Sequence, residues 1–368
     1  MKIRRLSNSI LLLAILLLTA VGAQAQKIQT VDTEGNPVGY ASVANADNGK
    51  IIGTTDLQGF LADVGGARSI SITHVAFSPQ MVTVSSLPQD GRIVLQDGSF
   101  ELPEVTVSKK EQIYVQTYYR VIYMKDDTLV YYRSGVTDNE YNIRKKSVSA
   151  SHDHFSKGQY GILKFTLDKL LGGLFSSYSD LSTQNLCLGT SEKRGKFTLK
   201  QETDTRKSIK YNDSIVGYMV DDLNDHQRRL SIDNEVYNNL YHADNDSEKQ
   251  AKKREEKMEK EKNRVSTRYM VYNIDDDGHC GVADFVSKQV HVDYDRYSKI
   301  DKKFVHTRIW VEVFATDRAY VTKQELKEKK RDNKVNMTYE DLKEYERQKG
   351  VPALPDNVIA SIEKLMSK

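Results

Sequence analysis

Residues 53–60 read Gly53-Thr54-Thr55-Asp56-Leu57-Gln58-Gly59-Phe60, and this stretch decides the fold of the amino-terminal part of the chain. Asp56 can accept hydrogen bonds from the backbone amides that follow it, and Gly59 can take a positive φ without steric cost, so together they predict a tight turn. A β-prone run from Ile51 leads into this turn, and Phe60 returns the chain to a hydrophobic core. The stretch is therefore typical of a small β-rich domain.

Short strands and turn signals alternate over the whole segment from Lys27 to Gln96. Gly35-Asn36-Pro37 and Asp47-Asn48-Gly49 mark turns, whereas residues 69–73 and 81–84 alternate apolar and polar side chains. Alternation with a period of two places one face of a strand in the core and the other in water. The segment predicts a small antiparallel β-sandwich.

The same residues resemble a known family, the carboxypeptidase regulatory-like domain, which is a transthyretin-like β-sandwich. The matching pieces are Gly35–Val38, Ala41–Val43, Gly53–Phe60 and Ile70–Ile72. The resemblance implies a seven-stranded β-sandwich over residues 26–97 that contributes no catalytic residues. Domains of this family often stand at the amino terminus of exported envelope proteins of Gram-negative bacteria, so the resemblance also implies a periplasmic location or one at the outer-membrane surface.

Residues 1–25 have the pattern of a secretory signal peptide. Lys2, Arg4 and Arg5 precede an apolar run from Ile10 to Val21, and Ala23-Gln24-Ala25 offers a cleavage site. The apolar run is shorter than the roughly 20 residues that a membrane-spanning helix needs, so no transmembrane span is expected in the mature chain. The 368-residue precursor has 54 Lys and Arg against 51 Asp and Glu. Cleavage removes three basic residues and no acidic residue, so the mature chain has equal numbers of the two. A neutral mature chain gives no reason to expect a nucleic-acid partner.

Composition and patterning divide the chain after residue 97 into three parts. We expect a linker at residues 98–112, a larger β-rich α+β module at 113–320 and a helical tail at 321–368. In the tail, Thr322 with Glu325 and Thr338 with Asp341 predict two helix starts, and Gly350 followed by Pro352 predicts a stop. Pro355-Asp356 opens a last short helix. The predicted fold class is mainly β.

The larger module contains three conspicuous segments. A tyrosine-rich run at 112–134 predicts a β-hairpin whose rings cover a half-buried sheet face, rather than an open binding platform. Leucines from Leu163 to Leu174 recur at helical spacing and predict one amphipathic helix. Residues 247–264 form an insertion with charges of both signs, which indicates a solvated helix or a disordered segment.

One stretch has the oxygen spacing of a calcium loop. Asn273, Asp275, Asp277 and Asp284 occupy positions 1, 3, 5 and 12 of such a loop, and Gly278 occupies position 6. The flanking residues look like strands, however, and an Asp-Gly hairpin turn explains the same sequence. Both explanations remain open and the sequence favours the turn, so we expect no cofactor, with calcium as the alternative.

Cysteine and histidine give two further candidates. Cys187 and Cys280 can form a disulfide in an oxidising compartment or remain two separate buried thiols. His152 and His154 lie on one side of any strand that contains them, which would suit zinc, but no third ligand is identifiable from the sequence, so an ordinary surface position is favoured.

The sequence does not identify catalytic residues. It lacks the Gly-x-Ser-x-Gly elbow of serine hydrolases and the Gly-x-x-x-x-Gly-Lys loop that holds phosphate. We therefore expect a non-catalytic exported envelope protein that acts through contacts with an envelope protein or a glycan. The alternative is an exported hydrolase with a carboxylate or metal site in the larger module, because paired carboxylates leave no local signature. Whether the protein is an enzyme stays open at this stage.

Overall fold

A computed structural model of the chain describes residues 27–98, 110, 112–143, 147–155, 197–222, 225–332 and 337–367. Strands make up 51% of the structure and helices 20%, so the predicted mainly β class is confirmed. Among the described residues, no helix combines the length and the apolar character needed to cross a membrane.

The amino-terminal strands form two sheets. One has the order β4-β1-β7 and the other β3-β2-β5-β6. The strands are β1 Ile28–Val31, β2 Ser42–Asn45, β3 Ile51–Thr54, β4 Phe60–Leu61, β5 Ser69–His74, β6 Phe77–Thr83 and β7 Arg92–Val94, with a 3-10 turn η1 at Val84–Ser86. Buried side chains of both sheets, among them Ile28, Val43, Ile72 and Ile93, belong to one hydrophobic cluster. We call residues 27–98 the amino-terminal module.

The predicted turn at Asp56 and Gly59 is confirmed. Oδ1 of Asp56 accepts hydrogen bonds from the backbone amides of Gln58 at 2.9 Å and Phe60 at 2.8 Å. Gly59 has a φ of +76°, and its carbonyl accepts the amide of Thr30 at 2.8 Å. The turn therefore fixes β4 beside β1, because the residue that reverses the chain also bonds to the neighbouring strand.

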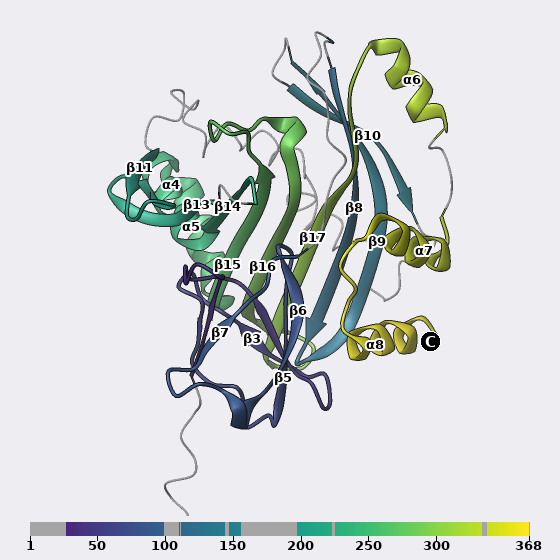
Figure 1. Cartoon of the computed structure of the whole chain (residues 1–368). Helices are drawn as coiled ribbons and strands as arrows, with labels where there is room; N and C mark the ends of the chain where they lie inside the picture. Colours follow the sequence, from purple (N-terminus) through teal and green to yellow (C-terminus); the bar gives the residue numbers. More distant parts are fainter. Residues whose placement is uncertain are drawn as a thin grey trace, which may run out of the picture.

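The strands described between Gln112 and Val321 build one ten-stranded sheet in the order β10-β9-β8-β17-β16-β15-β14-β13-β12-β11, seen in Figure 1 above the amino-terminal module. All neighbouring strands in it are antiparallel. The strands are β8 Gln112–Lys125, β9 Thr128–Asn142, β10 Ser147–Phe155, β11 Phe197–Gln201, β12 Arg206–Tyr211, β13 Ser214–Asp222, β14 Gln227–Asp233, β15 Glu261–Asn273, β16 Phe285–Ser298 and β17 Lys303–Val321. A 3-10 turn η3, Val282–Asp284, precedes β16.

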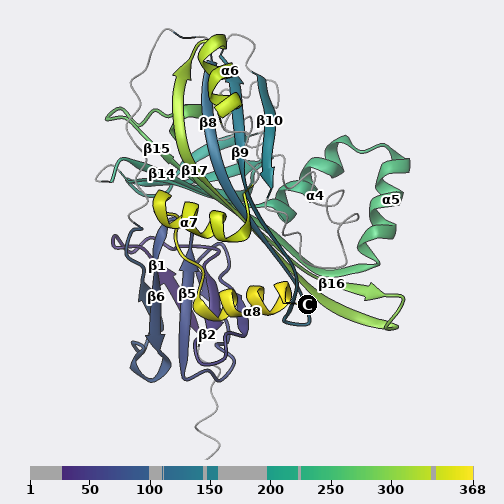
Figure 2. The ribbon, with the colours of Figure 1, turned by 90° about the vertical axis from the view of Figure 1, so that its right-hand side faces the viewer.

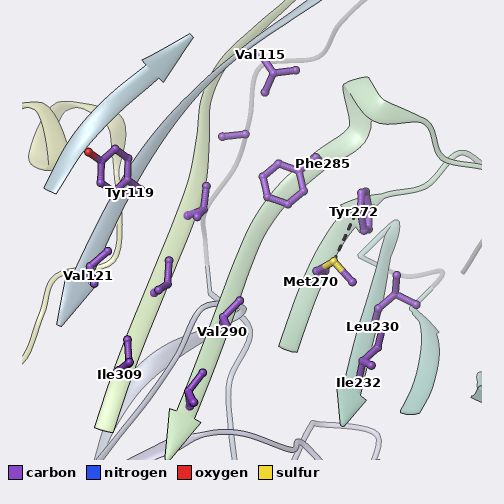
Figure 3. Packing of buried hydrophobic residues seen from close by; sticks show 14 of the residues in the cluster. Val115, Tyr119, Val121, Leu230, Ile232, Met270, Tyr272, Phe285, Val290 and Ile309 are labelled. Atoms are coloured by element: carbon purple, nitrogen blue, oxygen red, sulfur yellow. Dashed lines mark hydrogen bonds between the residues drawn. The ribbon is translucent and has the colours of Figure 1, made fainter. Parts of the chain in front are cut away.

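Both faces of the central strands are covered. Every residue of β8 from Gln112 to Tyr123 is buried, which explains why its sequence shows little apolar–polar alternation. One face carries a cluster that includes Tyr119, Met270 and Phe285 (Figure 3). The tyrosines of the predicted β8–β9 hairpin are buried, so they do not form an open platform.

The other face of the sheet packs against the amino-terminal module and the carboxy-terminal helices. Tyr118, Tyr269 and Phe314 from the sheet share a cluster with Ile72 of β5 and Leu342 of the tail. Figure 2 shows helices α7 and α8 beside the amino-terminal strands. The described helices are α4 Asn234–Asn245, α5 Glu248–Met258, α6 Lys323–Asp332, α7 Tyr339–Lys349 and α8 Asp356–Met366.

The helix boundaries of the tail follow the predicted capping residues. Thr322 and Glu325 exchange backbone–side-chain hydrogen bonds at the start of α6, and Thr338 and Asp341 do so at the start of α7. Gly350 ends α7 with a φ of 68°. These signals are confirmed because capping depends on neighbouring residues alone.

The structure of the charged insertion at 247–264 agrees only in part with the prediction. Residues 248–258 form helix α5, but the prediction for 261–264 was wrong, since they begin β15. Glu261 and Lys262 pair with Arg296 and Asp295 of β16, so at this end the sheet extends into solvent and its strands can carry charges. Helix α4 was not predicted, and the leucine-rich segment 163–174 lies outside the described residues.

Candidate functional site

Two of the four residues with calcium-loop spacing, Asp275 and Asp284, accept backbone amides with their side chains. Asn273 ends β15, and Oδ1 of Asp275 accepts the amides of Asp277 at 3.1 Å and His279 at 2.7 Å. Asp284 accepts the amide of Gly281 at 2.6 Å in η3. In the described part of the chain, the acidic group with metal-compatible spacing is Asp97, Asp222 and Asp225, and none of the four loop residues belongs to it.

The cysteine and histidine candidates stay predictions. Cys187 lies outside the described residues, as does the predicted signal peptide. Cys280 is half-buried with its Sγ 3.9 Å from Nη1 of Arg228, and burial raises the pKa of its thiol to about 11, which disfavours a reactive thiolate. His152 and His154 lie on the edge strand β10, opposite Asp138 and Val136 of β9.

A buried arginine joins the amino-terminal module to the ten-stranded sheet. Arg229 of β14 is 3% exposed, and its guanidinium lies 4.8 Å from the ring centroid of Phe77. Four carboxylates surround it: it bonds to Asp97, and its nitrogens lie 3.8, 3.5 and 3.7 Å from oxygens of Asp32, Asp222 and Asp225. We call these five residues the Arg229 cluster. Its acids outnumber its single base, so it concentrates negative charge at the module junction.

The Arg229 cluster predicts a dependence of stability on pH. Burial raises the pKa of Asp97 to about 6 against the opposing attraction of Arg229, and a hydrogen bond with Asp225 adds to the increase. Between about pH 4 and pH 6 the folded protein therefore binds more protons at Asp97 than the unfolded chain does. This contribution to the free energy of unfolding is present at low pH and is lost as the pH rises through 6.

The measurement is chemical denaturation of the wild type and of Asp97→Asn across pH 4 to 7. The difference between the two proteins isolates Asp97 from His74 and His291, whose burial lowers their pKa to about 3 and gives the opposite slope. We expect the free energy of unfolding of the wild type to fall relative to that of Asp97→Asn as the pH rises from 4 to 7. Parallel curves for the two proteins would contradict the assignment.

A polar pocket of about 340 Å³ lies where helices α4 and α5 meet β15. It is lined by Glu235, Asn238 and Asn239 of α4, Arg254 and Met258 of α5, and Glu261, Asn263 and Arg264 of β15. We call it the α4–α5 pocket. Its volume falls in the range of about 300–1,000 Å³ that is usual for ligand sites.

The local sequence explains how the pocket forms. Oδ1 of Asp233 accepts the amides of Glu235 and Val236 at 3.0 Å, so it starts α4 directly after β14. Asn263 takes a φ of 51° and donates to Oδ2 of Asp295 at 2.7 Å, at the point where the pairing of β15 with β16 shifts register between Lys262 and Val265. The helices thereby leave the sheet and return to it with a hollow in between.

Charge inside the pocket is arranged unevenly. Arg264 holds two acids, with Nε 3.3 Å from Oε2 of Glu235 and Nη1 2.7 Å from Oε2 of Glu261. Burial raises the pKa of Glu235 in spite of that arginine. Arg254 lies 3.6 Å from Asp246, and Asn238 and Asn239 are exposed. The pocket thus offers acceptors from its two acids and donors from Arg254 and the two amides.

Sequence reasoning missed this pocket. Arg254, Glu261 and Arg264 belong to the segment 247–264 that the sequence predicts as a solvated insertion, because charges of both signs at helical spacing favour that interpretation, and Glu235 lies outside it. The one local signal was Asp233, a helix-starting residue directly after a strand. The remainder of the pocket depends on the contact of β15 with helices α4 and α5, which the local sequence does not show.

Comparisons with known proteins do not show a family for this chain. No protein-family model matches the chain, and no curated protein matches it. A solved structure of lipovitellin, titled for its lipid–protein interactions, is 10% identical with a TM-score of 0.28, and the match covers 58% of this chain and 26% of that one. At this score the likeness supports no argument about fold or function.

Proposed function

We propose that the protein is a non-catalytic exported envelope protein that binds a glycan in the α4–α5 pocket. The observation that carries the proposal is the mixture of acceptors and donors around that space, where Glu235 and Glu261 offer acceptors and Arg254, Asn238 and Asn239 offer donors. Sugar hydroxyls both donate and accept hydrogen bonds, so they match such a lining.

Other classes of ligand fit less well. A simple anion would meet two carboxylates, and a purely apolar molecule would leave charged groups without water or partners. Met258, which is 50% exposed, offers an apolar contact for the carbon face of a sugar ring.

The remaining parts of the proposal concern location and architecture. The resemblance of residues 26–97 to the carboxypeptidase regulatory-like domain supports a β-sandwich that positions the larger module and takes no part in chemistry. The signal-like residues 1–25 support export to the periplasm or the outer-membrane surface. Contacts with an envelope protein would use surfaces other than the pocket.

Binding can be tested with an array of immobilised neutral and acidic oligosaccharides. We expect the wild type to bind a subset of them. Arg254→Ala and Asn239→Ala should each weaken that binding about tenfold or more, because each removes a hydrogen-bond donor of the protein and leaves an acceptor of the bound ligand unpaired. Lys253→Ala changes an exposed neighbour on the same helix and serves as the matched control. Equal binding by all four proteins, or none by the wild type, would sink the proposal.

A hydrolase remains the second candidate, favoured by one observation. Glu235 and Glu261 both pair with Arg264, and burial raises the pKa of Glu235; acid–base cleavage of a glycosidic bond also uses two carboxyl groups, of which one is protonated. Release of reducing sugar from a retained oligosaccharide, abolished by Glu235→Gln while binding persists, would favour the hydrolase. Retention without any product favours the binding protein.

A further inference from the structure

The tip of the β16–β17 hairpin combines exposed apolar side chains with lysines. Tyr297 and Phe304 face each other on its second-to-last pair, before Ser298 and Lys303, and they are 44% and 39% exposed, with ring centroids 5.5 Å apart. Ile300 in the connecting turn is 92% exposed. Figure 2 shows this hairpin extending past helix α8 at the lower right.

The turn holds Ile300 in that position. Oγ of Ser298 donates to Oδ2 of Asp301 at 2.7 Å and accepts the amide of Asp301 at 3.2 Å, and Lys302 adopts a φ of 51°. The connection is therefore an ordered turn with its apolar residue outward. An isoleucine at such a position contributes nothing to the hydrophobic core and leaves its apolar surface in water.

Basic residues surround the apolar tip. Four basic residues and one acidic residue lie between Arg296 and Phe304. Lys299 and Lys302 are exposed, and Lys303 pairs at 3.2 Å with Asp126 of the β8–β9 turn while staying 63% exposed. Lys262 of β15 places its Nζ 4.5 Å from the ring centroid of Phe304.

We propose that the β16–β17 tip, comprising Tyr297, Ile300, Phe304, Lys299, Lys302 and Lys303, docks on the surface of an anionic lipid bilayer. Ile300 enters the boundary between headgroups and acyl chains, the Tyr297 ring lies at headgroup depth, where a ring with a polar hydroxyl is favoured, and the apolar Phe304 ring lies beside it. The lysines reach the phosphates with their ammonium groups while their stems follow the rings.

Charge complementarity selects this occupant. The patch is small and carries a net positive charge, because Arg296, Lys299, Lys302 and Lys303 outnumber Asp301 and Asp126, whereas interfaces between proteins are depleted in lysine and need a larger area for stable association. A bilayer supplies negative charge and an apolar layer over a plane, so a protruding tip can use both without a complementary pocket. The inference is independent of the α4–α5 pocket.

The test is flotation of the purified protein with vesicles of phosphatidylcholine that contain phosphatidylglycerol, compared with vesicles of phosphatidylcholine alone. We expect flotation with the anionic vesicles only, weakened at high salt. Ile300→Asp should reduce the bound fraction about tenfold by removing the inserted side chain. Lys302→Glu should reduce it about fivefold or more.

Matched controls separate the tip from general surface chemistry. Met81→Asp changes a side chain that is 73% exposed on β6, and Lys200→Glu reverses an exposed charge on β11. Both should bind as the wild type does, and thermal unfolding should show that all variants fold, because the substituted residues are exposed. Absence of flotation, or flotation that Ile300→Asp leaves unchanged, would overturn the proposal. A dimer that sedimentation detects and Ile300→Asp abolishes would replace the bilayer with a second copy.

Discussion

Arg229→Met is expected to lower the free energy of unfolding by about 3–5 kcal/mol at neutral pH, because it leaves buried carboxylates without their counter-charge. Asp32 and Asp222 are 5% and 8% exposed at their side chains, so water cannot take over the role of the guanidinium. The loss should shrink as the pH is lowered and the acids of the Arg229 cluster are protonated.

Chemical denaturation at pH 7 and pH 4 checks this expectation. Arg68→Met alters an exposed arginine and should change stability by no more than about 0.5 kcal/mol. The double variant Arg229→Met with Asp222→Asn should recover part of the loss, since one unpaired charge is removed with the arginine. An equal loss at both pH values, with no recovery in the double variant, would show that packing on Phe77 and not charge carries the effect.

Gly59→Ala is expected to cost about 2–5 kcal/mol, the sum of an unfavourable backbone conformation and a steric overlap. Gly59 has a φ of +76°, and a Cβ there would lie 2.3 Å from the carbonyl oxygen of Thr30. That oxygen belongs to β1, so relief of the overlap would require β1 and the turn to separate.

Gly35→Ala is a closely matched control. Gly35 has a φ of +84°, but a Cβ there would meet nothing within 4 Å. Gly35→Ala should therefore lower the free energy of unfolding by about 1–2 kcal/mol, which is the cost of the backbone conformation alone. Unfolding curves for the two variants separate the two causes. Equal losses would mean that the approach to Thr30 is relieved without cost.

The sequence predicted the elements whose determinants are local. Asp56 with Gly59, and Thr338 with Asp341, act within three or four residues of the chain, so their pattern is visible without the fold. The mainly β class followed from similar short-range alternation. The β8 strand shows the limit, because it is buried on both faces and its tyrosines lie in cores whose other members come from distant segments.

The candidate sites needed long-range contacts. Asp97 and Arg229 are 132 positions apart, and neither position has a distinguishing neighbour in the sequence. The calcium-like spacing at 273–284 is visible locally, but the same oxygens also suit a turn that caps its own amides, and Asp275 and Asp284 bind amides in that way. Local spacing cannot tell these two uses apart, since both require acids followed by glycine.

The pairing of β8 with β17, which sets Val121 opposite Val311, has a consequence for biogenesis. During synthesis, β8 emerges long before β17 exists, and a strand that is buried on both faces in the folded protein exposes its apolar side chains for that whole interval. High contact order of this kind slows folding. The nascent polypeptide should therefore depend on a holding chaperone until its carboxy-terminal third arrives, and truncation before residue 303 should yield aggregates in place of a smaller soluble domain.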